Sequence, residues 1–185
     1  NADELARRFN VTAKHSIEKM AASYHDAFLT VSDITANECK YLLGREVTNI
    51  TPNGFENDFV WHGEEFAAKR NEARKAMIEV AEACLSHKFE KEPLIIGTSG
   101  RYEYRNKGLD IFMESLKRLA TYNLDREILA YVTVPAANNG ARADLVRHMQ
   151  DASQPIDAKQ WRFSTHYLDN MQWDPVSQAI KGSVL

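Results

Sequence analysis

The chain has 185 residues, enough for one sizeable hydrophobic core or two small ones. A hydrophobic fraction of 44% and a charged fraction of 26% are ordinary for a globular protein that folds in water. The net charge is -3, so no overall basic field favours nucleic acid or an anionic membrane as a partner. No apolar run approaches the ~20 residues of a membrane-spanning helix.

The two cysteines, Cys39 and Cys84, have neither metal-ligand spacing nor the pattern of a disulfide framework. We therefore expect a reducing, cytoplasmic setting. The sequence opens without an initiator Met and closes without a terminal signal, so we expect an internal piece of a longer protein.

The first part of the chain has the pattern of a β-α-β unit. Apolar spacing predicts one helix over residues 3–25 and a short buried strand over 27–32. A helix over 33–43 follows, with Ser32 or Asp33 as its cap, and Gly44 ends it. A second strand over 47–50 and a turn at the Thr-Pro-Asn-Gly of 51–54 complete the unit. This order is typical of a parallel α/β sheet.

A long charged helix over 64–89 comes next, and a helix of this kind bridges two domains or packs across one. Beyond it the pattern predicts a second α/β unit that resembles the first β-α-β of a Rossmann-like domain. Its predicted elements are a strand over 94–99, a polar connection over 100–107, a helix over 108–120, a strand over 127–134, a helix over 141–152, a strand over 162–165 and a helix after Pro175.

The polar connection after the first strand of this second unit carries the candidate site. Parallel α/β sheets bind ligands outside the carboxyl ends of their strands, and free N–H groups at a helix start favour anions. Arg101 offers a planar fork of donors and Lys107 a compact charge, while Gly100 and Gly108 let the backbone approach a ligand. The residues alone leave two readings open, a diphosphate cradle and a plain solvated loop. Neither a Walker-type loop nor G-x-G-x-x-G is present, so ATPase and dinucleotide functions have little support.

Each further candidate site residue can be interpreted in two ways. Asn53 and Gly54 follow a strand end and either face a ligand cleft or form a plain turn. Glu103 either orients the guanidinium of Arg101 or is solvated, and His166 either approaches the cleft or has a structural role. No pair of histidines has metal-ligand spacing, so we predict no metal site.

Four segments resemble, in the same order, the glycogen synthases of fungi and animals, the family-3 glycosyltransferases. They are IEKMAASYHDAFLTVSDITANECKYLL, VTNITPNGF, GRYEYRNKGLDIFMESLKRL and FSTHYLDNMQWDPVSQAI. The third resembles the family's G-R-Y-E-[FY]-x-N-K-G stretch, and the four together span nearly the whole chain. By this resemblance the chain is identified as an internal fragment of a family-3 enzyme, and we expect it to come from a bacterial member of the family.

The resemblance implies an α/β chain cut from a two-domain GT-B fold. Residues 1–63 would be the end of the first Rossmann-like domain, 64–92 a bridging helix, and 93–185 the start of the second, donor-binding domain. The implied activity is that of a glycogen (starch) synthase, a hexosyltransferase that transfers glucose with retention from UDP-glucose to an end of an α-1,4-glucan. No cofactor and no metal are implied.

In that family the matching arginine and lysine contact the donor diphosphate and stabilise the leaving UDP, which carries over to Arg101 and Lys107 as catalytic residues. The family's acidic segment and glycine-rich donor loop are missing, so we expect the fragment alone to be inactive. Two alternatives stay open. One is another GT-B glycosyltransferase with a different donor or acceptor, and the other is an oligomerisation and linker module in which the long helix pairs within a homo-oligomer.

Overall fold

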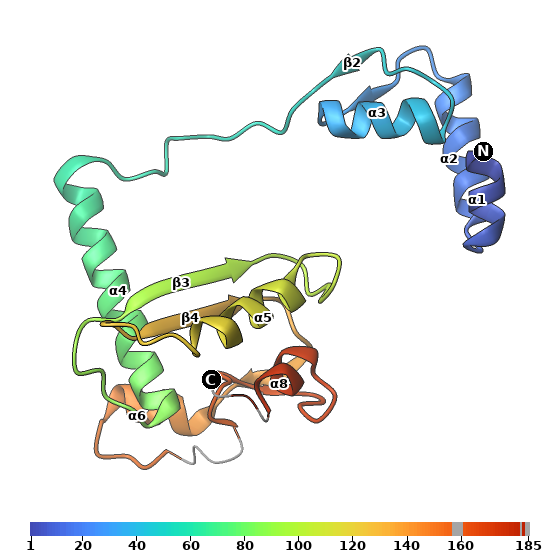
Figure 1. The fold of residues 1–185 in the computed structure, drawn as a ribbon. Coiled ribbons are helices and arrows are strands. Elements are labelled where there is room, and N and C mark those ends of the chain that lie inside the picture. The colour runs from blue at the N-terminus through green and yellow to red at the C-terminus, as the bar shows by residue number, and fades with distance from the viewer. Residues whose placement is uncertain (157–160, 182, 184–185) are drawn as a thin grey trace. The chain divides into compact units, whose positions relative to one another are not determined.

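A computed structural model describes residues 1–156, 161–181 and 183 of the chain. The chain divides into two compact units, Asn1–Val60 and Trp61–Leu185 (Figure 1). The predicted domain over 93–185 therefore includes positions 157–160, 182 and 184–185, which lie outside the described residues.

The first unit is the predicted β-α-β arrangement preceded by helices. Its elements are α1 (Ala2–Arg8), α2 (Thr12–Tyr24), β1 (Leu29–Thr30), α3 (Asp33–Leu42) and β2 (Asn49–Ile50). β1 and β2 pair in parallel, with Leu29 opposite Asn49. Ser32 caps α3 as predicted, because its hydroxyl accepts a hydrogen bond of 3.2 Å from the backbone N–H of Thr35.

Two predictions for this unit are wrong. The single helix over 3–25 is broken between α1 and α2 at Asn10, whose φ of 56° is left-handed, a conformation that Asn tolerates better than most residues. The turn predicted at 51–54 does not form, since residues 51–57 run without helix, strand or turn. The chain turns later, where the N–H of Val60 donates to the carbonyl of Asn57 at 2.9 Å.

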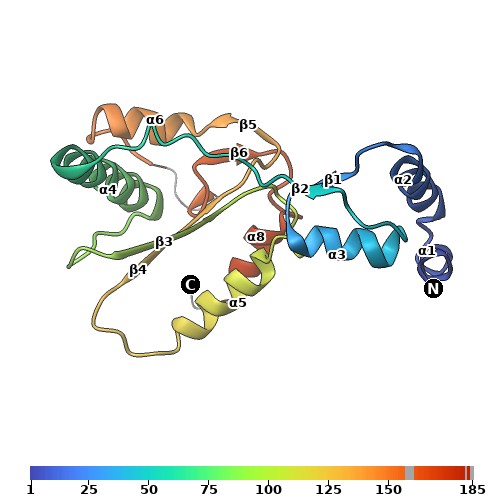
Figure 2. The same cartoon turned by 90° about the horizontal axis from the view of Figure 1, so that it is seen from above.

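The second unit contains the predicted β-α-β and additional elements around it. In chain order these are α4 (Gly63–Leu85), β3 (Leu94–Ser99), α5 (Leu109–Leu119), β4 (Ile128–Thr133), β5 (Asn138–Ala141), α6 (Ala143–Gln150), β6 (His166–Leu168) and α8 (Pro175–Ile180). β3 and β4 pair in parallel along their whole length. Figure 2 shows α4 and α6 on one side of these strands and α5 and α8 on the other. The helix predicted over 64–89 is confirmed as α4 and belongs to this unit.

The core of the second unit forms around α5 and the strands. Leu109, Met113 and Leu116 are buried along one face of α5, and Leu129 of β4 is buried as well. This i, i+4, i+7 spacing is the reason that the sequence pattern located α5 correctly. On the other side, α4 and α6 pack together through buried small and apolar residues: Ala81, Cys84 and Leu145.

The strand predicted over 162–165 is wrong. The strand in this region is β6, and it pairs antiparallel with β5, so that Leu168 lies opposite Asn138. Neither strand has the apolar alternation that marks a strand in sequence, because β5 reads Asn-Asn-Gly-Ala and all four of its residues are exposed. Among the described residues, no helix has the length and apolarity needed to cross a bilayer.

Candidate functional site

The candidate site is the β3–α5 loop, residues 100–108, which begins where β3 ends. Gly100 has a φ of 147°, and its N–H lies 3.4 Å from the carbonyl of Thr133 at the end of β4. Gly108 caps α5 with a left-handed φ of 69°, although nothing stands within 4 Å of the place that a Cβ would occupy. The glycine at 108 is therefore required by the backbone conformation and not by crowding.

The two predicted cations, Arg101 and Lys107, both lie on this loop, and Glu103 contacts each of them. Nη1 of Arg101 lies 3.0 Å from Oε1 of Glu103, and the Arg101 side chain is 74% exposed. The carbonyl of Glu103 accepts a 2.9 Å hydrogen bond from the N–H of Lys107, whose side chain is exposed. Exposed ion pairs contribute about 0–1 kcal/mol, so an incoming phosphate can replace Glu103 at the guanidinium at little cost.

The start of α5 has fewer free backbone N–H groups for an anion than the sequence suggested. The N–H of Asp110 donates to the carbonyl of Tyr104 at 3.2 Å, and the N–H of Ile111 donates to the Asp110 carboxylate at 2.9 Å. The expectation of free N–H groups is therefore wrong for these two positions. Asp110 also places a negative charge at the positive end of the helix dipole. The positive charge of this loop therefore comes from side chains, those of Arg101, Arg105 and Lys107.

Tyr102, next to Arg101, joins the loop to the start of α8. Its hydroxyl donates to Oδ2 of Asp174 and accepts from the N–H of Val176 at 3.3 Å. Burial, and then the bond to the Asp174 carboxylate, raise the pKa of Tyr102 well above its usual range, so its hydroxyl keeps its proton. Nothing in the sequence pattern pointed to this contact.

A cavity of about 1190 Å³ lies beside β4. Residues of α4, α5, β4 and the segment 162–180 line it, and Tyr102 and Asp174 stand among them. Arg101 and Lys107 do not line this cavity.

The other predicted site residues lie on other segments of the chain. Asn53 and Gly54 are exposed and lie in the first unit, whereas Arg101 and Lys107 lie in the second. Their place in a shared cleft stays a prediction. His166 is exposed at the start of β6, and its Nδ1 lies 2.9 Å from Oγ1 of Thr165. In the described part of the chain, no cluster of three or more His, Cys, Asp or Glu side chains is arranged to hold a metal ion.

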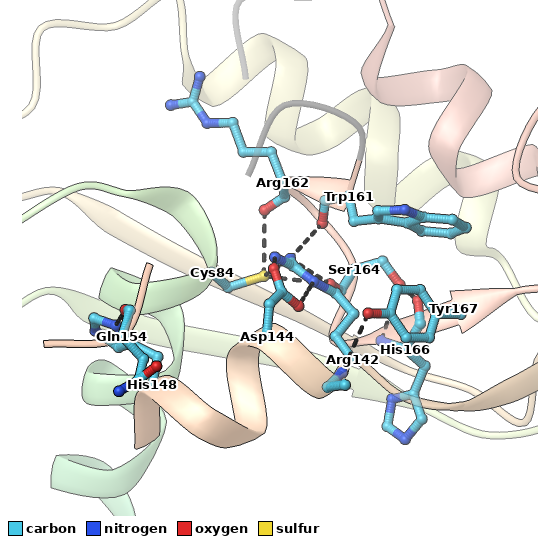
Figure 3. Close-up of polar contacts among 11 residues, drawn as sticks. Cys84, Arg142, Asp144, His148, Gln154, Trp161, Arg162, Ser164, His166 and Tyr167 are labelled. Carbon is cyan, nitrogen blue, oxygen red and sulfur yellow. Dashed lines mark hydrogen bonds and ion pairs between the residues drawn. The ribbon is translucent and has the colours of Figure 1, made fainter. Parts of the chain in front are cut away.

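Sequence reasoning missed a buried polar cluster around Arg142, shown in Figure 3. The Arg142 side chain is fully buried, and its Nε and Nη2 donate to the two oxygens of Asp144 at 3.1 and 2.7 Å. Its Nη1 donates to the carbonyls of Trp161 and Ser164 at 2.9 and 3.2 Å. In the sequence, an Arg-x-Asp at the start of an amphipathic helix has the pattern of exposed surface charges. No feature of the sequence distinguished this pair from such charges.

The thiol of Cys84, on α4, joins the same cluster. Its Sγ lies 3.3 and 3.4 Å from the carbonyls of Arg162 and Ser164. Burial raises the pKa of this thiol, so it is protonated and serves as a donor rather than a nucleophile. The cluster therefore ties α4, α6 and the segment that leads into β6 to one another.

A parallel β-α-β unit with a cationic loop at the carboxyl end of β3 defines an α/β domain, and open α/β sheets bind their ligands at loops in this place. The sequence model of the family described as "Glycogen synthase" matches residues 1–158. The chain belongs to the glycogen synthase family.

Curated relatives agree with this assignment. The chain is 33% identical over 156 residues to glycogen [starch] synthase isoform 2 of Saccharomyces cerevisiae. The matched segment covers 80% of this chain and 22% of the yeast protein. The glycogen [starch] synthase of Neurospora crassa is 30% identical over 154 residues, and the human liver enzyme is 30% identical over 155, with the same shares covered. The chain thus spans about a fifth of the length of these relatives. The family match ends at 158, so the resemblance noted over 163–180 lies beyond it.

Proposed function

We propose that the protein containing this chain is a glycogen (starch) synthase. It transfers glucose from UDP-glucose, with retention of configuration, to the non-reducing end of an α-1,4-glucan such as glycogen. The observation that carries the proposal is the β3–α5 loop, which places Arg101 and Lys107 at the carboxyl end of β3 in a chain of this family. The names of the yeast, Neurospora and human relatives support the same activity.

The chemistry of the transfer explains why two cations are needed. As the glycosidic C–O bond of the donor breaks, negative charge grows on the diphosphate of the leaving UDP. Arg101 presents two parallel N–H donors to the phosphate oxygens, and Lys107 adds a point charge. Cations that are already in place lower the barrier, because they gain more from the developing charge than from the ground state.

Glu103 has a role that follows from its contact with Arg101. In the absence of a donor it holds the guanidinium by an exposed ion pair of 3.0 Å. The diphosphate then takes the place of the Glu103 carboxylate. We therefore assign Glu103 to orienting Arg101 before the donor binds.

The remaining assignments follow the sequence predictions. Residues 1–63 belong to the first Rossmann-like domain, 93–185 to the donor-binding domain, and α4 bridges them. Asn53 and Gly54 contribute to the cleft, the enzyme works in the cytoplasm, and the 185-residue chain by itself has no transfer activity.

A donor assay on the whole protein tests the activity. UDP-glucose and ADP-glucose are compared, each with and without glycogen, and transfer of labelled glucose to glycogen is measured. We expect transfer from UDP-glucose that depends on glycogen. Transfer from neither donor, or transfer to an unrelated acceptor, contradicts the proposal and favours another GT-B glycosyltransferase.

The alternative of an oligomerisation and linker module draws on α4, whose first half is exposed over residues 63–73. A homo-oligomer would bury this surface. Light scattering on the chain and on the whole protein tests it, and monomers in both cases exclude this role.

A further inference from the structure

The side chain of Tyr102 ties the β3–α5 loop to a distant part of the chain. Its neighbour Arg101 is largely exposed, whereas Tyr102 is half-buried and points its hydroxyl at the start of α8. The hydroxyl makes two bonds there, one to the Asp174 carboxylate and one from the Val176 N–H. These partners lie more than 70 positions further along the chain.

The anchor on the α8 side is itself fixed. Asp174 is the N-cap of α8, and its Oδ1 accepts a 2.7 Å hydrogen bond from the N–H of Ser177. Pro175 occupies the first turn of α8, where its fixed φ suits the helix. α8 in turn packs against α5, the helix that the loop leads into. Asp174 therefore presents its second oxygen to Tyr102 from a defined position.

We propose that Tyr102 and Asp174 are positioning residues for the donor diphosphate, because their bond fixes the backbone from which Arg101 reaches the phosphates. This inference rests on the proposed function. An arginine side chain loses much conformational freedom when it is ordered by a ligand. Fixing the adjacent residue in advance removes part of that cost and sets the direction of the guanidinium.

Two backbone hydrogen bonds hold the ends of the loop, so fixing the backbone next to Arg101 falls to the side chain of Tyr102. The N–H of Gly100 bonds to Thr133, and the N–H of Lys107 bonds to Glu103, so both ends of the loop are held by the backbone. Between these ends, Tyr102 supplies a side-chain anchor outside the loop. The raised pKa of Tyr102 keeps the hydroxyl a donor to the carboxylate across the range in which the enzyme would work.

The test is the substitution Tyr102→Phe in the whole protein, which removes one hydroxyl and keeps the ring. We expect kcat/KM for UDP-glucose to fall by about 10- to 100-fold, while KM for glycogen stays unchanged. Tyr104→Phe is the matched control, because Tyr104 is a half-buried tyrosine of the same loop whose hydroxyl bonds to none of the described residues. It should retain the wild-type donor kinetics. Asp174→Asn should lower kcat/KM for the donor in the same direction as Tyr102→Phe.

A double-substitution cycle separates positioning from a general structural role. If Tyr102 acts through Arg101, Tyr102→Phe costs little further activity once Arg101→Ala is present. Additive losses, or an equal weakening of donor and acceptor use, overturn the proposal. All kinetics are measured below the unfolding midpoint of each variant, and Asp174→Asn carries the test if Tyr102→Phe does not fold.

Failure of this inference differs from failure of the proposed function. Wild-type donor kinetics in Tyr102→Phe, together with a large loss in Arg101→Ala, removes the positioning role and leaves the function standing. No use of UDP-glucose by the wild type removes the function itself, whereas wild-type kinetics in Arg101→Ala removes the role of Arg101, and the positioning role with it, but not the function.

Discussion

Arg101 and Lys107 are both exposed cations, yet the loop holds them differently. Arg101 is paired with Glu103 and follows directly on a glycine, whereas Lys107 is held through its backbone N–H and leaves its ammonium group in solvent. A bidentate fork suits one phosphate, and a mobile point charge can follow the second. The two residues should therefore make separable contributions to catalysis.

Arg101→Ala and Lys107→Ala should each lower kcat for glucosyl transfer by about 10²–10³-fold, as loss of a contact to developing charge does. Arg105→Ala is the matched control, since Arg105 is an exposed arginine of the same loop. Steady-state kinetics with UDP-glucose check the expectation. Near-normal turnover in both variants, or an equal loss in Arg105→Ala, would refute the assignment.

Asp3 shows how a single carboxylate joins two helices in the first unit. It lies 2.8 Å from the ammonium of Lys19 and 2.7 Å from Nε2 of His15, both on α2. Hydrogen bonds from Lys19, and then from His15, lower the pKa of Asp3 from 3.8 to about 2. A lowered pKa means that the ionised form favours the folded state.

The stabilisation from Asp3 is present above pH 4 and should be lost as the pH falls from about 4 to 2. Urea unfolding of the wild type and Asp3→Asn should differ at pH 6 and converge at pH 2. The exposed neighbour Glu4 provides the control, and Glu4→Gln should show no comparable difference. A constant gap between wild type and Asp3→Asn across this range would contradict the pKa shift.

Between secondary-structure elements, the Arg142 cluster joins α4, α6 and the segment before β6. The guanidinium donates hydrogen bonds to both carboxylate oxygens of Asp144 and to two backbone carbonyls, so each of its nitrogens has an acceptor inside the protein. Removing the carboxylate would take away a counter-charge that lies directly beside this buried positive charge. Such a loss is far more costly than the loss of an exposed ion pair.

Asp144→Asn should therefore lower the free energy of unfolding by about 3–5 kcal/mol. The double variant Arg142→Met, Asp144→Leu should cost much less, because it removes both charges together. Urea unfolding measures both, and Asp125→Asn is the control for an exposed carboxylate. An Asp144→Asn variant as stable as Asp125→Asn would show that the cluster contributes little.

The elements also show where sequence patterns succeed and fail. β3 and α5 were located to within a residue, because each has the apolar spacing of its own period. The break at Asn10 was missed, because one left-handed residue interrupts a pattern that otherwise continues. β5 and β6 were missed because their pairing comes from contact between distant segments and not from local apolar alternation.

Across the whole chain, the two units differ in the size of their cores. Ala6, Ala22 and Thr30 are the buried residues of the first unit among those described, while many of its large apolar side chains are exposed. The second unit packs α5 against α8 and α4 against α6, with buried residues on α5, β4, α4 and α6. A small core supports little stability, so the first unit should be the less stable of the two.

Limited chymotrypsin digestion of the 185-residue chain tests this difference. Phe55 and Phe59 are 71% and 66% exposed and lie outside helices and strands, so cleavage should begin there. We expect a resistant product that begins near Trp61 and rapid degradation of the first unit. Mass spectrometry identifies the products, and equal survival of both units would contradict the expectation.

The sequence by itself determined the family, the order of most elements and the loop that carries Arg101 and Lys107. These features depend on residue spacing within short segments, which a pattern records directly. Only the tertiary structure decided that Tyr102 meets Asp174, and that Arg142 is buried beside Cys84, 58 positions away. The reason is physical: whether a polar side chain is solvated or paired depends on what folding brings next to it, and spacing along the chain does not contain that information.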